Sequence, residues 1–350
     1  MPHTRSTYFL ELHHFRAFAI ANVFFIHVWW LPSSKKFDAP SFFVNGIREL
    51  LFHGSTIYFL FISGFLFFFL ASKRFTIKRH YWRKFKFVVV PYTIWSLIAL
   101  ALGHIQGTDH RLCTQHSVWE RIKTVTLILF EGSAVFVYWF IPVIICLFLV
   151  SPLFLKISRR DFAAVTTVAS LLPLLGTRTG SELTFQQFLY FAPPFLVGGW
   201  VYQHYELFQY AIQKYRSILL LIVFLSSGCI VYITYYSVRF PFVDLKEGLF
   251  YVQKMAAACF VTYLLLPIKR PLLLLDLLAK YSFSIYFTHY LLYMITAPFF
   301  SDFLEYWQIY GWVTIPLSFL FSACLLVVNL AICILLKKAL GNYSRLIMGS

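Results

Sequence analysis

The sequence predicts an all-α fold in the form of a polytopic bundle of transmembrane helices. Its 350 residues are 60% hydrophobic and 21% aromatic, and only 13% are charged, which excludes an ordinary water-soluble globule. Apolar runs of about 18 residues or more recur along the chain, and such unbroken runs favour helices over the alternating strands of an outer-membrane barrel. No long polar stretch remains for a soluble domain, so residues 1–350 are predicted to form a single integral-membrane domain.

We expect about ten membrane-spanning helices with both termini in the cytoplasm. The predicted spans are residues 8–30, 51–71, 86–104, 134–155, 161–178, 184–203, 217–237, 249–267, 279–299 and 313–336. With this orientation, lysines and arginines between the spans are about twice as frequent on the cytoplasmic side as on the outer side, which agrees with the positive-inside rule.

Charge and cysteine content limit the expected partners. The net charge of +16 comes from basic residues between apolar spans, which membrane topology explains, so we expect a lipid bilayer and no nucleic acid as partner. The six cysteines show no C-x-x-C spacing, so neither a metal site nor a disulfide framework is expected.

The first predicted span carries two polar residues, Arg16 and His27, in an otherwise apolar run. Eleven positions at about 100° each bring the second side chain to within about 20° of the first, about 16 Å further along the helix. A cation inside a spanning helix costs about 2.5–3.5 kcal/mol, so it normally faces a protein interior or a wet cavity. The pair therefore indicates a functional path. The alternative is that Arg16 snorkels to one surface while His27 lies in the aromatic interfacial belt.

The second span and the loop after it contain residues suited to an anionic ligand. Ser63 and Gly64 lie mid-span, where small side chains allow the close approach of a neighbouring helix or of a slender ligand arm. In the following loop, Arg79 and Arg83 are spaced i, i+4 with Lys84 beside them, a fork suited to the phosphate oxygens of a nucleotide-bearing cofactor. A topology signal alone also explains these cations.

An external segment between the third and fourth spans breaks the pattern. It is amphipathic from Val118 to Phe130, so we expect a helix that lies at the outer surface or dips back toward the core. Glu131 is expected to open the fourth span, shortly before Trp139, and both are candidate contacts for a polar substrate. The alternative for Glu131 is an ordinary acidic residue in the first turn of a helix.

The ninth span places His289 at mid-membrane, with Tyr286 one turn before it and Ser282 and Ser284 nearby. A histidine at this depth indicates function, so His289 and Tyr286 are candidate substrate contacts. Hydrogen bonding of His289 to a neighbouring helix is the competing interpretation.

Several of these segments together resemble the acyltransferase-3 family of integral-membrane acyltransferases, which includes O-acetyltransferases of cell-envelope glycans. LHHFRAFAIANVFFIH is similar to the family's first-span phrase, in which an arginine and a histidine are separated by ten residues. The family's leading aspartate and its glycine after the arginine are absent here. Five further phrases resemble the family in order: YFLFISGFLFFF, RHYWRKFKFVVVPY, YWFIPVIICLFLVSP, FAPPFLVGGWVY and SFSIYFTHYLL. The resemblance covers most of the chain.

The resemblance implies roles for five of the candidate residues. His27 would be the catalytic histidine and Arg16 its partner in the transfer site. Arg79, Arg83 and Lys84 would contact the phosphates of the donor, acyl coenzyme A (acyl-CoA). From their own positions in the sequence, Ser63 is a further candidate contact for the donor. The candidate contacts for the acceptor, on the same ground, are His289, Glu131, Trp139 and Tyr286.

The expected function is therefore membrane O-acylation. The resemblance implies transfer of an acetyl group from cytoplasmic acetyl-CoA to a hydroxyl of a cell-envelope polysaccharide or glycolipid sugar, in the bacterial inner membrane. One alternative is a transporter or flippase for an envelope glycan or lipid, with Arg16, His27 and His289 along its route, although no inverted repeat is detectable. A second alternative is an O-succinyltransferase on the same fold. The sequence leaves open whether His27 acts as a general base or becomes acylated, and whether the chain forms a homo-oligomer.

Overall fold

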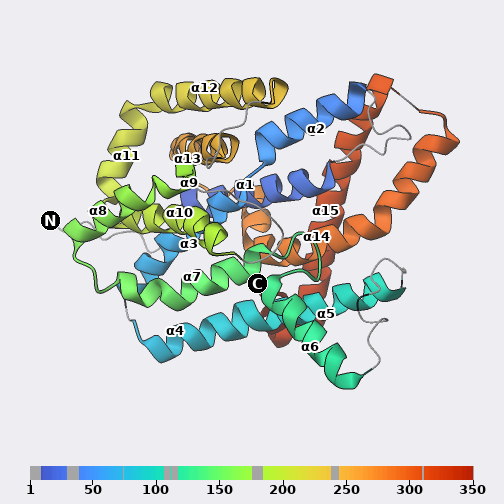
Figure 1. Cartoon of the computed structure of the whole chain (residues 1–350), viewed down its shortest axis with the longest axis horizontal. Helices are drawn as coiled ribbons and strands as arrows, with labels where there is room; N and C mark the ends of the chain where they lie inside the picture. Colours follow the sequence, from blue (N-terminus) through green and yellow to red (C-terminus); the bar gives the residue numbers. More distant parts are fainter. Residues whose placement is uncertain are drawn as a thin grey trace.

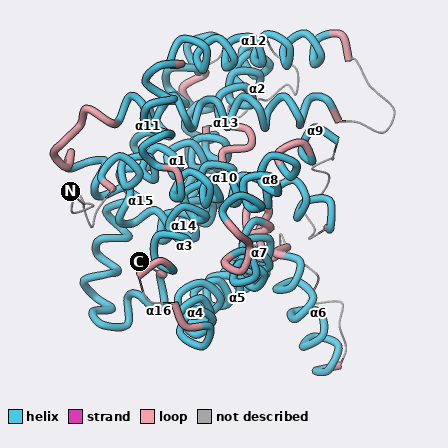
Figure 2. Tube along the Cα trace, turned by 90° about the vertical axis from the view of Figure 1, so that its left-hand side faces the viewer, coloured by secondary structure: helices cyan, strands magenta, loops and turns pink. Residues whose placement is uncertain are grey.

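The computed structural model describes residues 9–29, 39–73, 75–105, 111, 117–175, 184–237, 244–309 and 311–349. Within these ranges the chain forms helices joined by turns, with no strand, which confirms the all-α prediction. Figure 1 shows α12 at one edge of the molecule and α4 at the opposite edge, with α1, α3 and α10 between them. Figure 2 shows the same arrangement from the side, where α6 projects from the body of the molecule.

Sixteen α-helices and three short turns of other helical type follow one another along the described chain. Their bounds are α1 (Leu10–Val28), α2 (Ala39–Phe52), α3 (Thr56–Ala71), α4 (Ile77–Lys84), the π-helical turn η1 (Phe85–Val89), α5 (Val90–Ile105), α6 (Val118–Glu131), α7 (Phe140–Phe154), α8 (Arg159–Ala169), α9 (Leu172–Leu175), α10 (Phe185–Gln203), α11 (Tyr205–Lys214), α12 (Arg216–Tyr235), α13 (Leu245–Leu265), α14 (Leu273–Tyr306), the 3-10 turn η2 (Gly311–Val313), α15 (Thr314–Leu340), the 3-10 turn η3 (Gly341–Tyr343) and α16 (Ser344–Met348).

The central helix is α1, which packs most extensively against α14 and also contacts α2, α3, α13 and α15. Its 19 residues give a length of about 28 Å, close to the thickness of the hydrocarbon core of a bilayer. By composition, α1 is not among the described helices that are apolar enough to cross a membrane. The adjoining pair α3 and α10 approaches closely because two glycines face each other's backbone. A Cβ at Gly64 would collide with the carbonyl of Phe195, and a Cβ at Gly198 would collide with the carbonyl of Phe61. The predicted close approach at Gly64 is confirmed.

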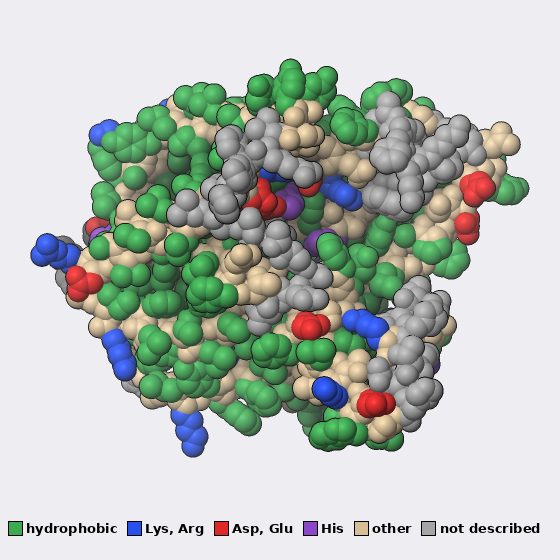
Figure 3. Space-filling model, in the orientation of Figure 1, with side chains coloured by type: hydrophobic (Ala, Val, Ile, Leu, Met, Phe, Trp, Pro, Cys, Tyr) green, Lys and Arg blue, Asp and Glu red, His purple; other side chains and the backbone are tan. Residues whose placement is uncertain are grey.

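The periphery of the molecule is apolar, as expected for contact with lipid. In the part of the chain that the structure describes, five helical segments are long and apolar enough to cross a membrane: Phe42–Ala71, Ile77–Ile105, Arg216–Tyr235, Leu245–Leu265 and Gly311–Met348. Large side chains of α12 and α15, including Phe224 and Leu335, point outward with about two thirds of their surface exposed. Figure 3 shows hydrophobic side chains spread across the face in view, with few charged side chains between them. These observations support a helical membrane protein; the ten-span topology stays a prediction.

Four predicted spans differ clearly from the structure. The span 51–71 crosses the turn between α2, which ends at Phe52, and α3, which begins at Thr56, and the span 279–299 is only part of α14. The other two are 161–178 and 134–155. Residues 161–178 do not form one long helix, because α8 ends at Ala169 and α9 begins only at Leu172. Pro173 has no N–H to donate to the carbonyl of Ala169, four residues earlier, so the hydrogen-bond ladder of α8 cannot continue there. Residues 176–178 lie outside the described residues. The predicted span 134–155 begins as turns, and its helix starts only at Phe140.

One buried cation has a structural role. Lys254 of α13 is only 2% exposed, and its ammonium group donates hydrogen bonds to the carbonyls of Leu50 and Leu51, at 3.3 and 2.7 Å. These carbonyls lie in the last turn of α2, where helix carbonyls have no intrahelical partner and favour a positive charge. Lys254 therefore stabilises the end of α2 next to the start of α3.

Candidate active site

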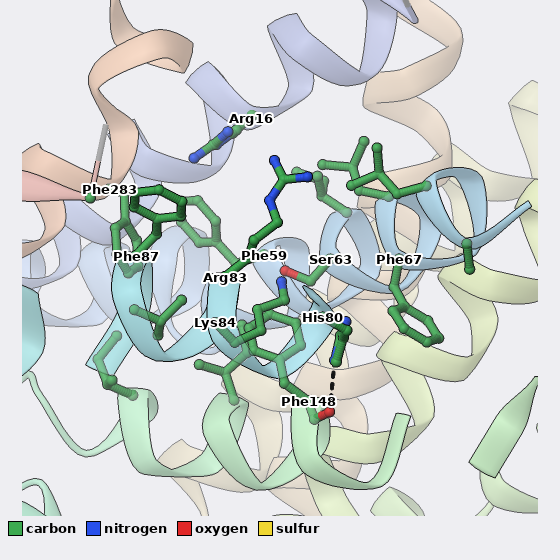
Figure 4. Close-up of a pocket in the computed structure, with 18 of the residues that line it drawn as sticks. Arg16, Phe59, Ser63, Phe67, His80, Arg83, Lys84, Phe87, Phe148 and Phe283 are labelled. Carbon is green, nitrogen blue, oxygen red and sulfur yellow. Dashed lines mark hydrogen bonds between the residues drawn. The ribbon is translucent and has the colours of Figure 1, made fainter. Parts of the chain in front are cut away.

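A cavity of about 620 Å³ lies between α1, α3, α4, α7, α14 and α16. Six of the predicted site residues line it: Arg16, Ser63, Arg79, Arg83, Lys84 and Tyr286. Figure 4 shows Arg16 of α1 and Arg83 and Lys84 of α4 around this space, with Ser63 of α3 nearby. The two regions that the sequence indicated separately, the first span and the loop after the second span, therefore meet in one site.

The cavity has a strongly positive lining. Six of its lining residues are lysines or arginines: Arg16, Lys73, Arg79, Arg83, Lys84 and Arg345. No aspartate or glutamate is among the described residues that line it. Like charges held together in this way repel one another unless an anion lies between them. The remaining lining is largely apolar and aromatic, with Phe140, Ile141, Ile144 and Phe148 of α7 forming one wall. The cavity is therefore suited to a ligand with an anionic part and a slender apolar part.

Local helix geometry directs the basic residues of α4 into the cavity. Arg79 and Arg83 lie one turn apart on α4, and Lys84 directly precedes the π-helical turn η1. Pro91, just after η1, has no N–H to donate to the preceding turn, which accounts for the irregular hydrogen bonding there. The ammonium group of Lys84 lies 3.4 Å from the centroid of the Phe148 ring, a cation–π contact that holds it against the apolar wall.

His80 and Arg345 also line the cavity, and the sequence did not single them out as site residues. His80 donates from Nε2 to the carbonyl of Phe148, at 3.1 Å, as the dashed line in Figure 4 shows. Arg345 comes from α16, which packs back against α5 and α14. The only sequence signal for Arg345 is its charge near the end of a span, which the positive-inside rule already explains.

The predicted pair Arg16 and His27 faces one helix, α14. Arg16 shares its cavity with Ser282, Phe283 and Tyr286 of that helix, and the His27 ring lies 5.6 Å from the ring of His289 on α14, centroid to centroid. The prediction that both side chains point the same way is confirmed. Because they are eleven residues apart on α1, the two residues lie at two levels of the helix bundle, about 16 Å apart along the helix axis.

The ring of His289 lies between that of His27 and that of Tyr286, which lines the cavity. The centroids of the His289 and Tyr286 rings are 5.9 Å apart. Nδ1 of the completely buried His289 lies 2.7 Å from the carbonyl of Tyr286 and 3.1 Å from that of Ile285. Carbonyls only accept, so Nδ1 carries the proton and, in the neutral ring, Nε2 is a hydrogen-bond acceptor. Nε2 has no hydrogen-bond partner among the described residues. A buried acceptor of this kind is suited to a hydroxyl donor.

Two predicted site residues lie apart from this arrangement. Trp139 is buried with its ring 5.3 Å from that of Phe191. The prediction that Glu131 opens the fourth span is wrong, because Glu131 is the last residue of α6 and accepts a hydrogen bond from Ser133, at 3.3 Å. The physical reason is Gly132, whose φ of 76° ends the helix in the left-handed conformation.

The amphipathic segment predicted from Val118 to Phe130 is confirmed as a helix, namely α6. Roles of Glu131 and Trp139 toward a substrate stay predictions.

The fold and the cavity together describe a helical membrane protein with an internal cavity whose lining is basic and apolar. The family model described as an acyltransferase domain matches residues 9–338, which is nearly the whole chain. The chain belongs to the acyltransferase-3 family, and it is therefore a membrane acyltransferase. No curated protein and no solved structure matches it. Within the described ranges, no group of three or more histidine, cysteine, aspartate or glutamate side chains is arranged to hold a metal ion.

Proposed function

We propose that the protein transfers an acetyl group from cytoplasmic acetyl-CoA to a hydroxyl of a cell-envelope polysaccharide or glycolipid sugar, in the bacterial inner membrane. The observation that carries this proposal is the cavity itself, in which six cations and no described acidic residue face one space that is otherwise largely apolar. The donor has the matching chemistry, since its phosphate groups are anionic and a long, thin arm carries its thioester. The cation bias of the loops supports a cytoplasmic position for both termini.

The donor's phosphates are assigned to the arginines of α4. Arg79 and Arg83 lie one turn apart on the same side of the cavity as Lys84. Guanidinium groups donate two parallel hydrogen bonds to phosphate oxygens, which supplies both charge and geometry. Ser63 and the apolar side chains of α7 line the space that the thioester arm would occupy.

The transfer step is assigned to His27. In our proposal, the imidazole of His27 takes the proton from the acceptor hydroxyl, whose oxygen attacks the thioester carbonyl carbon. The carbon–sulfur bond breaks, coenzyme A leaves as its thiolate, and the proton on His27 then passes to that sulfur. His289 lies beside His27 and its Nε2 can accept a hydrogen bond from the sugar. Arg16, on the cavity side, would stabilise negative charge on the donor.

The donor site is tested by the double variant Arg79→Ala/Arg83→Ala in purified protein. Each charge-assisted hydrogen bond contributes about 1.5–3 kcal/mol, so the dissociation constant for acetyl-CoA should rise at least about tenfold. Isothermal titration calorimetry in detergent measures this. The matched control is Arg159→Ala/Arg160→Ala, which removes two exposed arginines of α8 that do not line the cavity. Equal binding by both double variants would show that the basic residues of α4 serve only as a topology signal.

A further inference from the structure

A second cavity, of about 490 Å³, adjoins the first one, and it is also basic. Its lining includes four cations, Arg16, Lys280, Lys337 and Arg345, together with the polar residues Asn342 and Ser344. Arg16, Arg345 and Gly349 line both cavities. No acidic residue is among the described residues of its lining. The positive region described above therefore extends past Arg16 and Arg345 into a separate space.

The two lysines of the second cavity come from different helices, and both lie near the aromatic ring of Tyr281. The ammonium groups of Lys280 (α14) and Lys337 (α15) lie 5.9 and 5.2 Å from the centroid of the Tyr281 ring. Neither forms an ion pair with a carboxylate in the part of the chain that the structure describes. Two like charges near one aromatic ring repel each other, and a bound anion relieves that repulsion.

The wall shared by the two cavities is fixed in place by α16. Trp95 Nε1 donates to the carbonyl of Ile347, at 3.0 Å, and Ser284 Oγ donates to the carbonyl of Met348, at 3.3 Å. Met348 is completely buried. The guanidinium group of Arg345 lies 4.3 Å from the centroid of the Phe87 ring. These contacts position Arg345 at the boundary, so a ligand that fills both spaces has a cation at their junction.

We propose that the second cavity is a binding site for the 3′-phosphate of the acyl donor, with Lys280 and Lys337 as its principal contacts. This inference rests on the proposed function. The thioester arm of acetyl-CoA is attached at the diphosphate, and the 3′-phosphate lies on the ribose beyond it. If the arm lies along the apolar wall of the first cavity, the diphosphate lies among the cations of that cavity and the 3′-phosphate lies further from the thioester. The adjoining basic cavity meets this requirement, because Lys280 lies further from His289 along α14 than Tyr286 does.

The test compares two donors that differ by one phosphate. Acetyl-CoA and acetyl-3′-dephospho-CoA are titrated against wild-type protein and against the double variant Lys280→Gln/Lys337→Gln in neutral-lipid nanodiscs. Wild-type protein should bind acetyl-CoA at least about tenfold more tightly than the dephosphorylated donor, since a phosphate monoester makes charge-assisted hydrogen bonds to both lysines. The variant should lose this preference while its affinity for the dephosphorylated donor stays unchanged, which also shows that it is folded.

Two controls separate this proposal from its alternatives. Lys269→Gln/Lys338→Gln removes two exposed lysines that line neither cavity, and this variant should keep the wild-type preference. Arg79→Ala/Arg83→Ala should weaken binding of both donors by the same factor, because its contacts are assigned to the diphosphate.

Three outcomes would overturn the assignment. The first is an unchanged preference in Lys280→Gln/Lys337→Gln, or no preference in the wild-type protein. The second is that the lysine pair affects binding of an anionic phospholipid added to the nanodiscs but not the donor preference, which would make the cavity a lipid phosphate site. The third is that wild-type protein binds neither donor, which would overturn the proposed function as well. The first two outcomes leave the proposed function standing.

Discussion

Arg16 is the residue at which the two basic cavities meet. It lines both of them, and it faces the same segment of α14 that carries Tyr286. A guanidinium group has donors on several edges in one plane, so it can bind one anionic group while its other edge remains available. A lysine at this position would carry the same charge on a single rotating ammonium group. The planar fork is therefore the property that we expect to matter at this position.

The first prediction follows from that property. Arg16→Lys should retain a folded protein but lower the transfer rate at saturating acetyl-CoA by about tenfold or more, because charge is kept and oriented hydrogen bonds are lost. Steady-state kinetics in proteoliposomes measure the rate. A comparison with Lys84→Arg, which also exchanges one cation for another, shows whether the effect is specific. A wild-type rate for Arg16→Lys would contradict an orienting role for the guanidinium group.

At the residue scale, spacing predicts some of the site and misses the rest. The eleven-residue interval between Arg16 and His27 is a property of one helix, so their common direction could be predicted and is confirmed by their shared neighbour α14. Lys280, Lys337 and Arg345 line the second cavity because α14, α15 and α16 pack against one another. In the sequence, Lys337 and Arg345 look like ordinary cytoplasmic flanks of spans and Lys280 lies at the start of one, so only tertiary packing distinguishes them.

At the scale of elements, the contact between α3 and α10 holds one side of the cavity. Gly64 and Gly198 each place the backbone of one helix against a carbonyl of the other. Ser63, which lines the cavity, is the residue before Gly64. The position of Ser63 relative to the basic residues of α4 therefore depends on this close approach, which only residues without a bulky side chain permit.

The second prediction concerns these glycines. Gly64→Ala and Gly198→Ala should each destabilise the protein by about 1–3 kcal/mol, because the added methyl group overpacks a backbone contact that cannot yield. Thermal unfolding in detergent, followed by intrinsic fluorescence, measures the effect. Gly228 of α12 provides the control, since a Cβ there meets nothing within 4 Å. Gly228→Ala should be neutral or slightly stabilising, and a loss of stability equal to that of Gly64→Ala would contradict the packing argument.

Helix existence was easier to predict than helix ends. The long apolar runs of α1, α10, α12, α13 and α15 fall close to the predicted ranges. The predicted span 161–178 is divided by a turn before Pro173, and Glu131 closes α6 rather than opening the next helix. Hydrophobicity averaged over a window gives the presence of a helix. Its ends depend on single residues such as Gly132, whose backbone conformation a window does not report.

At the scale of the whole molecule, the site has two levels joined by α1 and α14. The lower level is the pair of basic cavities around Arg16. The upper level contains His27 and His289, whose rings lie 5.6 Å apart. Tyr286 connects them, since it lines the larger cavity and its ring lies 5.9 Å from that of His289. This separation suits a reaction whose donor enters from one side of a membrane and whose acceptor is modified at the other.

The most direct test of this account is acetyl transfer in sealed proteoliposomes, with radiolabelled acetyl-CoA on the side of the termini and envelope glycan on the opposite side. Wild-type protein should label the glycan. His27→Ala should reduce labelling by about 10²–10⁴-fold, the usual contribution of a general base, while acetyl-CoA binding stays unchanged. His27→Gln should be as inactive, because glutamine cannot take up a proton. Wild-type labelling by His27→Gln, or movement of unmodified glycan across the membrane without labelling, would contradict the account.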